Sequence, residues 1–421
     1  MMKKCISSIL LIFVLSLIGV YANNSTIPAG KQVNISEIED DLSVPDAFEI
    51  NLDSLLYVFK GGKHLSKDCV SDEKGEMLPD HIYIKRLQQL PVIMEMSYNS
   101  IVRRYIEVYT VKKRKQVEYM LGVGKYYFPM FEQALDAAGL PIELKYLPVI
   151  ESALNPTAFS RAGASGLWQF MYSTGKMYGL QGNSLVDERR DPIKSTEAAV
   201  EFLKDLYAIY NDWTLVIAAY NCGPGNVNKA INRAGGKRDY WAIYNYLPRE
   251  TRGYVPAFIA ATYTMSYPKE HNFCPADVEI PVSSDTLILT ERVHLIQIAE
   301  MLDIELSVLQ SLNPQYRKDI IPGNGIPYTL CLPQKHINNF MNRKDEILAY
   351  KSEELNTNRI VVEPASADPY YRGARGNTYK VQAGDTLSGI SRKQGVTVAQ
   401  IKKLNNLRSD NLRIGQHLKL R

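Results

Sequence analysis

The chain has 421 residues with a net charge of +4, and 45% of them are hydrophobic and 22% charged. At about 100–200 residues per domain, this length predicts two to four domains, and the composition excludes a wholly disordered, collagen-like or coiled-coil rod protein. The one long apolar run lies at the N-terminus. We therefore also exclude a protein with several membrane spans.

Residues 1–22 have the pattern of a secretory signal peptide. Two lysines precede a mostly apolar stretch, and Val20 and Ala22 place small residues at the −3 and −1 positions of a cleavage site. The alternative is a membrane anchor, which needs about 20 apolar residues. We expect cleavage after Ala22, no transmembrane span in the mature chain, and an exported protein of the periplasm or cell envelope.

The five cysteines predict neither a lipid anchor nor a metal site. Cys5 precedes the apolar run, and residues 20–24 contain no cysteine for lipidation. The other four, Cys69, Cys222, Cys274 and Cys331, are far apart and without zinc-site spacing. Export permits disulfides, but the sequence leaves their pairing open.

Residues 23–118 divide into a polar leader and a helical region. The chain is polar to about Asp46, and apolar residues recur at helical spacing from about His81 to Tyr119. The basic run 112–115 is interpreted as a solvated helix face, with an anionic polymer contact as the alternative. The role of the whole region stays open.

Residues 119–270 are expected to form one compact helical domain. Apolar stripes at helical spacing precede Gly139 and fill 197–210, and the nearly all-apolar run 213–220 predicts a buried helix. Glycines and prolines lie between these segments.

The C-terminal third contains an internal repeat. At a constant offset of 92 residues, Leu295 aligns with Leu387, Asn313 with Asn405 and Gly323 with Gly415. Each unit is predicted to run strand, helix, helix, strand, over 280–335 and 377–421. The polar segment 336–376 between them is interpreted as a linker.

Four short clusters concentrate the residue types that chemistry requires. Glu151 ends an apolar segment, where partial burial would raise the pKa of a carboxyl and let it act as a general acid. Gly163 and Gly166 permit a tight turn near a ligand, before Trp168 and Gln169. The other two clusters are 218–225, with Tyr220 and Asn221, and 249–255, with Tyr254.

These ordered motifs resemble the soluble-lytic-transglycosylase family, whose catalytic domain has a goose-type-lysozyme-like fold. The resemblance covers roughly 119–267, and the C-terminal unit is similar to a LysM module, with 280–335 as a degenerate LysM-like one. The implied fold class is α+β multidomain: a mainly all-α lysozyme-like catalytic domain followed by small βααβ modules.

The resemblance also implies the site residues. Glu151 is the expected catalytic acid. The expected substrate-binding residues are Ser152, Gly166, Trp168, Gln169, Tyr220, Asn221 and Tyr254. In the LysM module, the expected glycan-binding residues are Gly384, Asp385, Thr386, Leu387 and Asn405, with turn and cap roles as the alternative for Asp385 and Asn405.

The implied reaction is lytic cleavage of peptidoglycan without cofactor or metal. Near Glu151 no second carboxylate is apparent, because Asp187, Glu188 and Asp191 lie among arginines and are interpreted as an ion network. A single acid suits an intramolecular attack by the C6 hydroxyl of N-acetylmuramic acid, giving a 1,6-anhydro end. A hydrolytic muramidase and an inactive wall-binding protein are the alternatives.

Residues 377–421 carry nine Lys or Arg against two Asp, for a net charge of +7. Nucleic acid is one class of partner for such a surface. Aromatic residues are scarce here, which argues against nucleic acid, and the resemblance to a LysM module implies glycan strands of an acidic wall instead. Protein partners and oligomeric state stay open.

Overall fold

The computed structural model describes residues 74–355, apart from 279, 282 and 324, and residues 378–381, 385–394, 396–407, 412 and 416–420. The expected signal peptide, the polar leader, Cys5, Cys69 and Gly384 lie outside the described residues.

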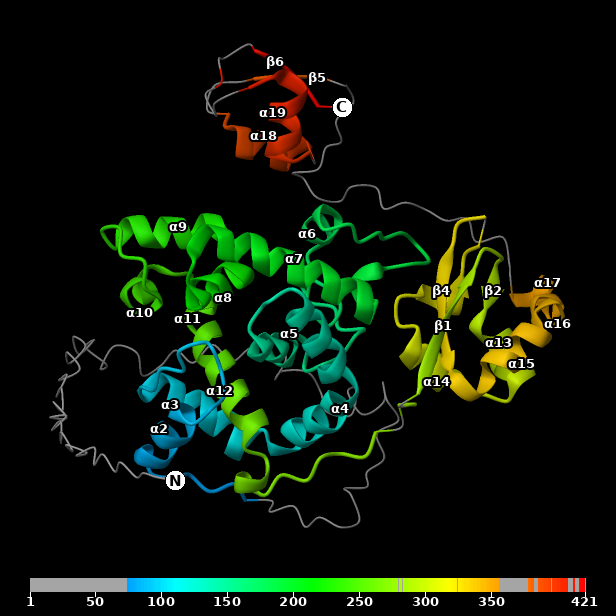
Figure 1. The fold of residues 1–421 in the computed structure, drawn as a ribbon, viewed down its shortest axis with the longest axis horizontal. Coiled ribbons are helices and arrows are strands. Elements are labelled where there is room, and N and C mark those ends of the chain that lie inside the picture. Colours follow the sequence, from blue (N-terminus) through cyan, green and yellow to red (C-terminus); the bar gives the residue numbers. More distant parts are fainter. Residues whose placement is uncertain are drawn as a thin grey trace, which may run out of the picture. The chain divides into compact units, whose positions relative to one another are not determined.

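The first half of the described chain is helical, which confirms the expected all-α domain (Figure 1). Its main helices are α2 (Asp80–Gln88), α3 (Ser100–Glu107), α4 (Arg114–Ala137), α5 (Leu147–Ser152), α6 (Tyr172–Met177), α7 (Pro192–Tyr210), α8 (Trp213–Cys222), α9 (Pro224–Arg233), α10 (Tyr240–Ile243), α11 (Arg249–Arg252) and α12 (Tyr254–Ser266). The expected buried run 213–220 lies in α8, and Glu197–Tyr210 forms most of α7.

Helix α12 occupies the centre of this domain. Every residue from Tyr254 to Met265 is buried, as expected for a helix that is apolar on all sides. Helices α3, α5 and α8 all pack against it. Aspartates position the surrounding helices at their N-termini: Asp191 accepts backbone N–H bonds at the start of α7, and Asp212 does so at the start of α8.

Residues 80–112 belong to the helical domain, although the sequence placed its boundary at 118/119. Helix α4 runs through that boundary, and α3 buries Val102, Tyr105 and Ile106 in its packing. The interpretation of the basic run as solvated holds for Lys112 and Lys115, which are exposed, but is wrong for Arg114. It is buried, it donates to the carbonyl oxygens of His271 and Asn272, and its guanidinium lies 4.3 Å from the Phe273 ring centroid.

The first LysM-like unit follows the expected strand–helix–helix–strand order. Strand β1 (Ser284–Leu289) pairs antiparallel with β4 (Tyr328–Pro333), and β2 (Val293–His294) pairs with β3 (Ile320–Ile321). Helices α13 (Leu295–Leu302) and α14 (Leu306–Leu312) lie between them in sequence.

The expected linker 336–376 begins with helices, which corrects its start. Helices α15 (Ile337–Asn342), α16 (Lys344–Ala349) and α17 (Ser352–Leu355) follow β4 directly. Helices α15 and α16 pack against α13 of the first unit. Phe340 and Ile347, two apolar residues in an otherwise polar segment, are therefore fully buried in the core of that unit. Residues 356–376 lie outside the described residues.

The C-terminal unit has the same order on a smaller scale. Strands β5 (Thr378–Lys380) and β6 (His417–Lys419) pair antiparallel, with α18 (Leu387–Gln394) and α19 (Val398–Asn405) between them (Figure 1). Its core is a separate cluster that includes Val381, Ile390, Ile401 and Leu418.

The first unit is joined to the helical domain by the segment before α7. Val186 forms a β-bridge with Tyr316, the Arg317 N–H donates to the Leu185 carbonyl at 2.6 Å, and the Asp187 N–H donates to the Gln315 carbonyl at 2.9 Å. Leu185 and Val186 are buried in the same apolar cluster as the unit's own core. We call residues 185–187 and 315–317 the seam.

Candidate active site

Glu151 lies in the last turn of the short helix α5. The apolar residues before it, Leu147, Val149 and Ile150, are buried against the domain core, whereas Glu151 is half-buried. Ala153 and Leu154 have φ values of 51° and 60°, which end the helix directly after Ser152. The local sequence therefore holds one carboxylate at the edge of the core.

Tyr254, the first residue of α12, donates a hydrogen bond from its hydroxyl to the Glu151 carboxylate. Burial, followed by the charge of Glu151, raises the pKa of Tyr254 well above its ordinary value. The phenol thus keeps its proton and remains a donor at neutral pH.

The end of α8 contributes two more of the expected residues. The Tyr220 hydroxyl donates to the Trp168 carbonyl at 2.8 Å, and burial followed by the Glu151 charge raises its pKa. Asn221 is exposed, and its Oδ1 accepts from Thr251 Oγ1 at 2.9 Å. The second, third and fourth motifs are therefore linked around Glu151 by hydrogen bonds.

The glycine-rich segment 163–170 is held in an unusual backbone conformation. Gly166 has φ 88°, and a Cβ there would lie 1.8 Å from the Arg189 carbonyl oxygen, so no other residue fits. Gln169 has φ 47°, and its Nε2 donates to the Gly166 carbonyl at 2.8 Å. Gln169 is half-buried beside this turn.

Arg189 holds this segment in place by hydrogen bonds to its backbone. Its Nη1 donates to the carbonyls of Gly163 (2.8 Å) and Phe170 (3.1 Å), while Nε and Nη2 bind both oxygens of Asp187 at 2.9 and 2.8 Å. All of these groups are largely buried, and bidentate pairing of this kind fixes geometry.

The other acidic residues of the 187–191 run are also engaged. Glu188 pairs with Lys194 at 2.5 Å, and Asp191 caps α7 through the N–H groups of Ile193 and Lys194. Burial raises the pKa of Asp191. The interpretation of this run as an ion network is confirmed for Asp187 and Glu188, whereas Asp191 serves as a helix cap.

Ser152 and Trp168 are not placed to touch a sugar, which corrects the expectation for both. The Trp168 ring is fully buried, packs edge-on against Phe131 at 5.2 Å and donates from Nε1 to Thr196 Oγ1. The Ser152 hydroxyl is also buried and donates to the Leu167 carbonyl at 2.9 Å. An indole in the core cannot offer a face to a ligand, so both residues support the site from within.

In the C-terminal unit the expected glycan-binding residues divide in a similar way. Leu387 is buried in the core. The side-chain amide of Asn405 donates to the Ile401 and Lys419 carbonyls, and its oxygen accepts from the Lys419 N–H. Thr386 is exposed, and Asp385 accepts a hydrogen bond from the Tyr379 hydroxyl at 2.7 Å. Gly384 lies outside the described residues.

Cysteine chemistry does not contribute to the site. Burial raises the pKa of the Cys222 thiol, which favours the unreactive protonated form. Cys222 and Cys331 are free thiols and Cys274 is disulfide-bonded. Within the described residues, no group of three or more His, Cys, Asp or Glu is placed to hold a metal ion.

Sequence reasoning missed three structural links. These are the bonds from Arg189 to the glycine segment, the bond from Thr251 to Asn221, and the seam at Leu185 and Val186. Two apolar residues directly before the charged run were the one available signal for the seam. Separately, no helix in the described part of the chain has the length and apolarity that a bilayer crossing needs.

Three family models match the chain. Residues 128–243 match the transglycosylase SLT domain, residues 283–349 the LysM-like domain of lytic transglycosylase MltD, and residues 379–421 the LysM domain. The first match contains Glu151, Gln169, Tyr220 and Asn221.

Curated relatives agree with these matches. Membrane-bound lytic murein transglycosylase D of Escherichia coli (strain K12) is 34% identical over 289 residues, which span 66% of this chain and 60% of that protein. Soluble lytic murein transglycosylase of the same organism is 36% identical over 116 residues, which span 26% of this chain and 18% of that protein. The probable peptidoglycan endopeptidase LytE of Bacillus subtilis (strain 168) is 59% identical over 44 residues, 10% of this chain and 13% of its own.

Among solved structures, the 70 kDa soluble lytic transglycosylase SLT70 from Escherichia coli is 29% identical to this chain. The superposition covers 36% of this chain and 26% of the SLT70 chain, with a TM-score of 0.30. The chain therefore contains three regions that are similar to known domains, in the order SLT transglycosylase domain, MltD LysM-like domain and LysM domain, and it spans about 60% of the length of lytic murein transglycosylase D.

Proposed function

We propose that the protein is a peptidoglycan lytic transglycosylase that cleaves the β-1,4 bond between N-acetylmuramic acid and N-acetylglucosamine. The observation that carries the proposal is the half-buried carboxylate of Glu151, held by the Tyr254 hydroxyl beside Tyr220 and within the motif order of the SLT domain. The names of the lytic murein transglycosylases to which the chain is similar support the same substrate.

In the proposed mechanism one residue acts first as acid and then as base. Protonated Glu151 gives its proton to the glycosidic oxygen as the C1–O bond breaks, and the C2 N-acetyl group of the substrate stabilises the charge at C1. The Glu151 carboxylate then takes the proton of the C6 hydroxyl as O6 bonds to C1. No water is consumed, and the product is a 1,6-anhydromuramic end.

Tyr254 suits the first half of this cycle. Because its pKa is raised, its hydroxyl donates to Glu151 at neutral pH and stabilises the carboxylate that forms when the glycosidic oxygen takes the proton. The half-buried Gln169 and the exposed Asn221 are the polar groups proposed to hold the glycan. The hydrolytic alternative needs a second carboxylate, and Asp187, Glu188 and Asp191 are each engaged in structural bonds.

The C-terminal LysM domain is proposed to bind the same glycan and to raise its local concentration at the catalytic domain. Its exposed Thr386 and its basic charge support this role. We further propose that the protein is exported to the periplasm or cell envelope and is not lipidated, on the pattern of residues 1–22 and the position of Cys5.

The test is mass spectrometry of fragments released from purified sacculi by the wild type, by Glu151→Gln and by Glu201→Gln. Glu201 is an exposed carboxylate on α7 and serves as the matched control. We expect products one water lighter than hydrolytic ones from the wild type and the control, and none from Glu151→Gln. Ordinary reducing ends would establish water as the nucleophile, and activity of Glu151→Gln would refute the site.

A further inference from the structure

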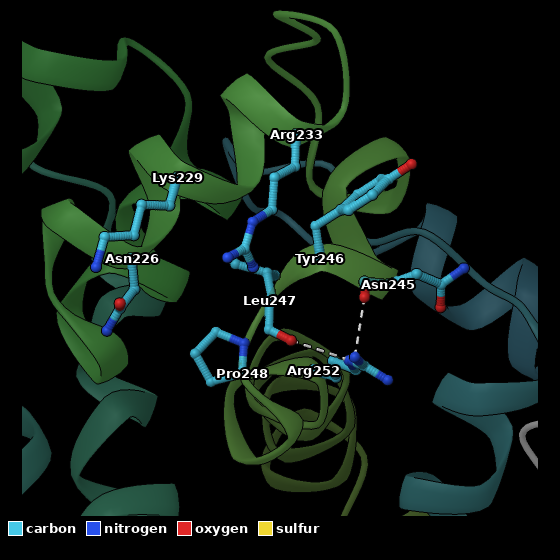
Figure 2. A pocket seen from close by; sticks show the side chains of 8 residues that line it. All are labelled: Asn226, Lys229, Arg233, Asn245, Tyr246, Leu247, Pro248 and Arg252. Carbon is cyan, nitrogen blue, oxygen red and sulfur yellow. Dashed lines mark hydrogen bonds between the residues drawn. The ribbon is translucent and has the colours of Figure 1, made fainter.

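We propose that a cationic pocket of the helical domain binds the phosphate group of a phosphate ester. The pocket has a volume of about 340 Å³ and lies between helix α9 and the segment 245–252, which includes α11 (Figure 2). It shares no lining residue with the candidate active site. The inference therefore concerns a second site and goes beyond the proposed function.

One wall of the pocket is the polar face of α9. Asn226, Lys229 and Arg233 follow the spacing i, i+3, i+7, which places them on one side of the helix. The apolar residues of α9 fall on a different side and are buried: Val227, Ala230 and Ile231. Packing of this apolar side fixes the helix with its polar face toward the pocket.

Two positive charges on this wall have no internal counter-ion. Lys229 and Arg233 are exposed, and within the described part of the chain neither side chain forms an ion pair or a hydrogen bond. In Figure 2 the Arg233 side chain points from α9 toward the Leu247 backbone across the pocket. Such cationic donors favour an anionic ligand, which would supply the missing counter-charge.

The opposite wall presents a third cation in a fixed orientation. Arg252 Nε donates to the Leu247 carbonyl at 3.1 Å and its Nη2 to the Asn245 carbonyl at 2.9 Å, as the dashed lines in Figure 2 show. These two bonds fix the plane of the guanidinium and leave Nη1 as a further donor. None of the lining residues is acidic, so no charge within the lining opposes the three cations.

This arrangement fits a tetrahedral phosphate better than a planar carboxylate. The two oxygens of a carboxylate lie in one plane and are satisfied by a single guanidinium, whereas a phosphate presents oxygens in several directions to donors on two walls. Tyr246, which is 44% exposed, and Pro248 add an apolar part to the lining. That part suits the organic group of an ester.

Two kinds of molecule carry this chemistry. One is a soluble phosphate ester such as glycerol phosphate, and the other is the headgroup of an anionic phospholipid. Both offer the same phosphate group to the pocket, and they differ in whether a membrane surface must come with it. The experiment therefore measures the soluble ester first and vesicles second.

The first arm is calorimetric titration of the protein with glycerol phosphate at neutral pH and constant ionic strength. The proteins compared are the wild type, the double variant Lys229→Gln, Arg233→Gln, and the double variant Lys125→Gln, Lys176→Gln. Lys125 and Lys176 are exposed and lie outside the lining, so the second variant controls for the loss of two positive charges. We expect Kd to rise about tenfold or more in the pocket variant and to stay unchanged in the control.

Three outcomes of this arm would overturn the proposal. They are no binding of glycerol phosphate by the wild type, an equal rise of Kd in the control, and displacement of the ester by acetate as effectively as by inorganic phosphate. Thermal unfolding establishes that the exposed substitutions leave the fold intact. Glu151→Gln should bind the ester like the wild type, and weaker binding would contradict a site separate from Glu151.

The second arm is flotation with phosphatidylcholine vesicles that contain or lack phosphatidylglycerol. Binding that requires phosphatidylglycerol and is lost in the pocket variant alone would identify the lipid headgroup as the source. Binding of glycerol phosphate without binding to these vesicles would identify a soluble ester. Vesicle binding that the pocket variant retains would assign membrane contact to another surface and would refute the pocket as a headgroup site.

Discussion

The two LysM-type units share one architecture but differ in what their cores contain. Both use an asparagine at the end of the second helix in the same way: Asn313 bonds the Leu309 and Cys331 carbonyls and the Cys331 N–H, and Asn405 bonds the Ile401 and Lys419 carbonyls and the Lys419 N–H. The core of the first unit also includes Leu185 and Val186 of the helical domain, whereas the C-terminal unit has a core of its own.

A difference in length accompanies this difference in packing. The asparagine and the closing strand it bonds are 18 residues apart in the first unit and 14 in the second. The longer connection contains Tyr316 and Arg317, which form the seam with Val186 and Leu185. A few added residues thus convert an independent module into a part of the domain that carries Glu151.

The packing also assigns different tasks to the two units. Burial of Leu185 and Val186 contributes roughly 1.5–3 kcal/mol for each side chain. From Asp187 the seam continues to Arg189, which holds the Gly163 and Phe170 carbonyls next to Gln169. The first unit therefore supports the glycine segment of the site, and the second does not take part in that packing.

The largest expected effect comes from Arg189→Met, because Arg189 links Asp187 of the seam to the glycine segment. The substitution leaves the buried Asp187 carboxylate without its ion pair and removes the side-chain donor of the Gly163 and Phe170 carbonyls, of which Phe170 keeps a bond from the Ser165 N–H. We expect a loss of about 3–5 kcal/mol in the free energy of unfolding, measured by urea denaturation. Under native conditions kcat should fall more than KM rises, because Gln169 loses its support.

The matched control for Arg189→Met is Lys204→Met, which removes an exposed ion pair with Glu201 on α7. We expect no measurable loss of stability or activity from it. Equal effects of the two variants would contradict the role of the seam as a support of the site.

Acid should affect the helical domain before the C-terminal unit. Burial, together with the charges of Arg86 and Arg114, lowers the pKa of His271 to about 4. The unfolded chain, with an ordinary histidine pKa near 6.5, therefore binds the proton first as the pH falls. This histidine contributes stability above pH 6.5, and up to roughly 3 kcal/mol is lost between pH 6.5 and 4.

Calorimetric unfolding at several pH values measures this loss. His271→Gln should flatten the pH dependence of the main transition, whereas His417→Gln, at an exposed position in the C-terminal unit, should leave it unchanged. The same slope in the wild type and in His271→Gln would assign the acid sensitivity to other groups.

The smallest and most specific effect compares the two asparagines. Each of Asn313→Ala and Asn405→Ala removes three hydrogen bonds, two to a strand and one to a carbonyl of its own helix, at a cost of about 1–3 kcal/mol. Hydrogen exchange should show faster exchange in α14 and also in the seam for Asn313→Ala. For Asn405→Ala it should be confined to α19 and β6, and faster exchange at residues 185–187 in that variant would contradict the separation of the two units.

Much of the architecture followed from local patterns in the sequence. Helical periodicity located α7 and α8, and the 92-residue offset located both LysM-type units, because these patterns record which face of each element is buried. Glu151 emerged from its position at the end of an apolar segment, and the charged run 187–191 was correctly interpreted as an ion network. Between the closing strands of the two units the offset is 88 residues and not 92, and the alignment without gaps ended before those strands.

The remaining features depend on contacts between residues that are distant in sequence. Trp168 and Ser152 belong to the site motifs, yet both side chains are buried, because the indole packs against Phe131 and the serine hydroxyl bonds the Leu167 carbonyl. Likewise, nothing in the sequence around Leu185 and Val186 identifies Tyr316 as their partner, since 130 or more residues separate them. The sequence by itself determined the elements and the chemical groups; tertiary packing decided which of those groups reach solvent at Glu151, which support it from the core, and which LysM-type unit packs into the helical domain.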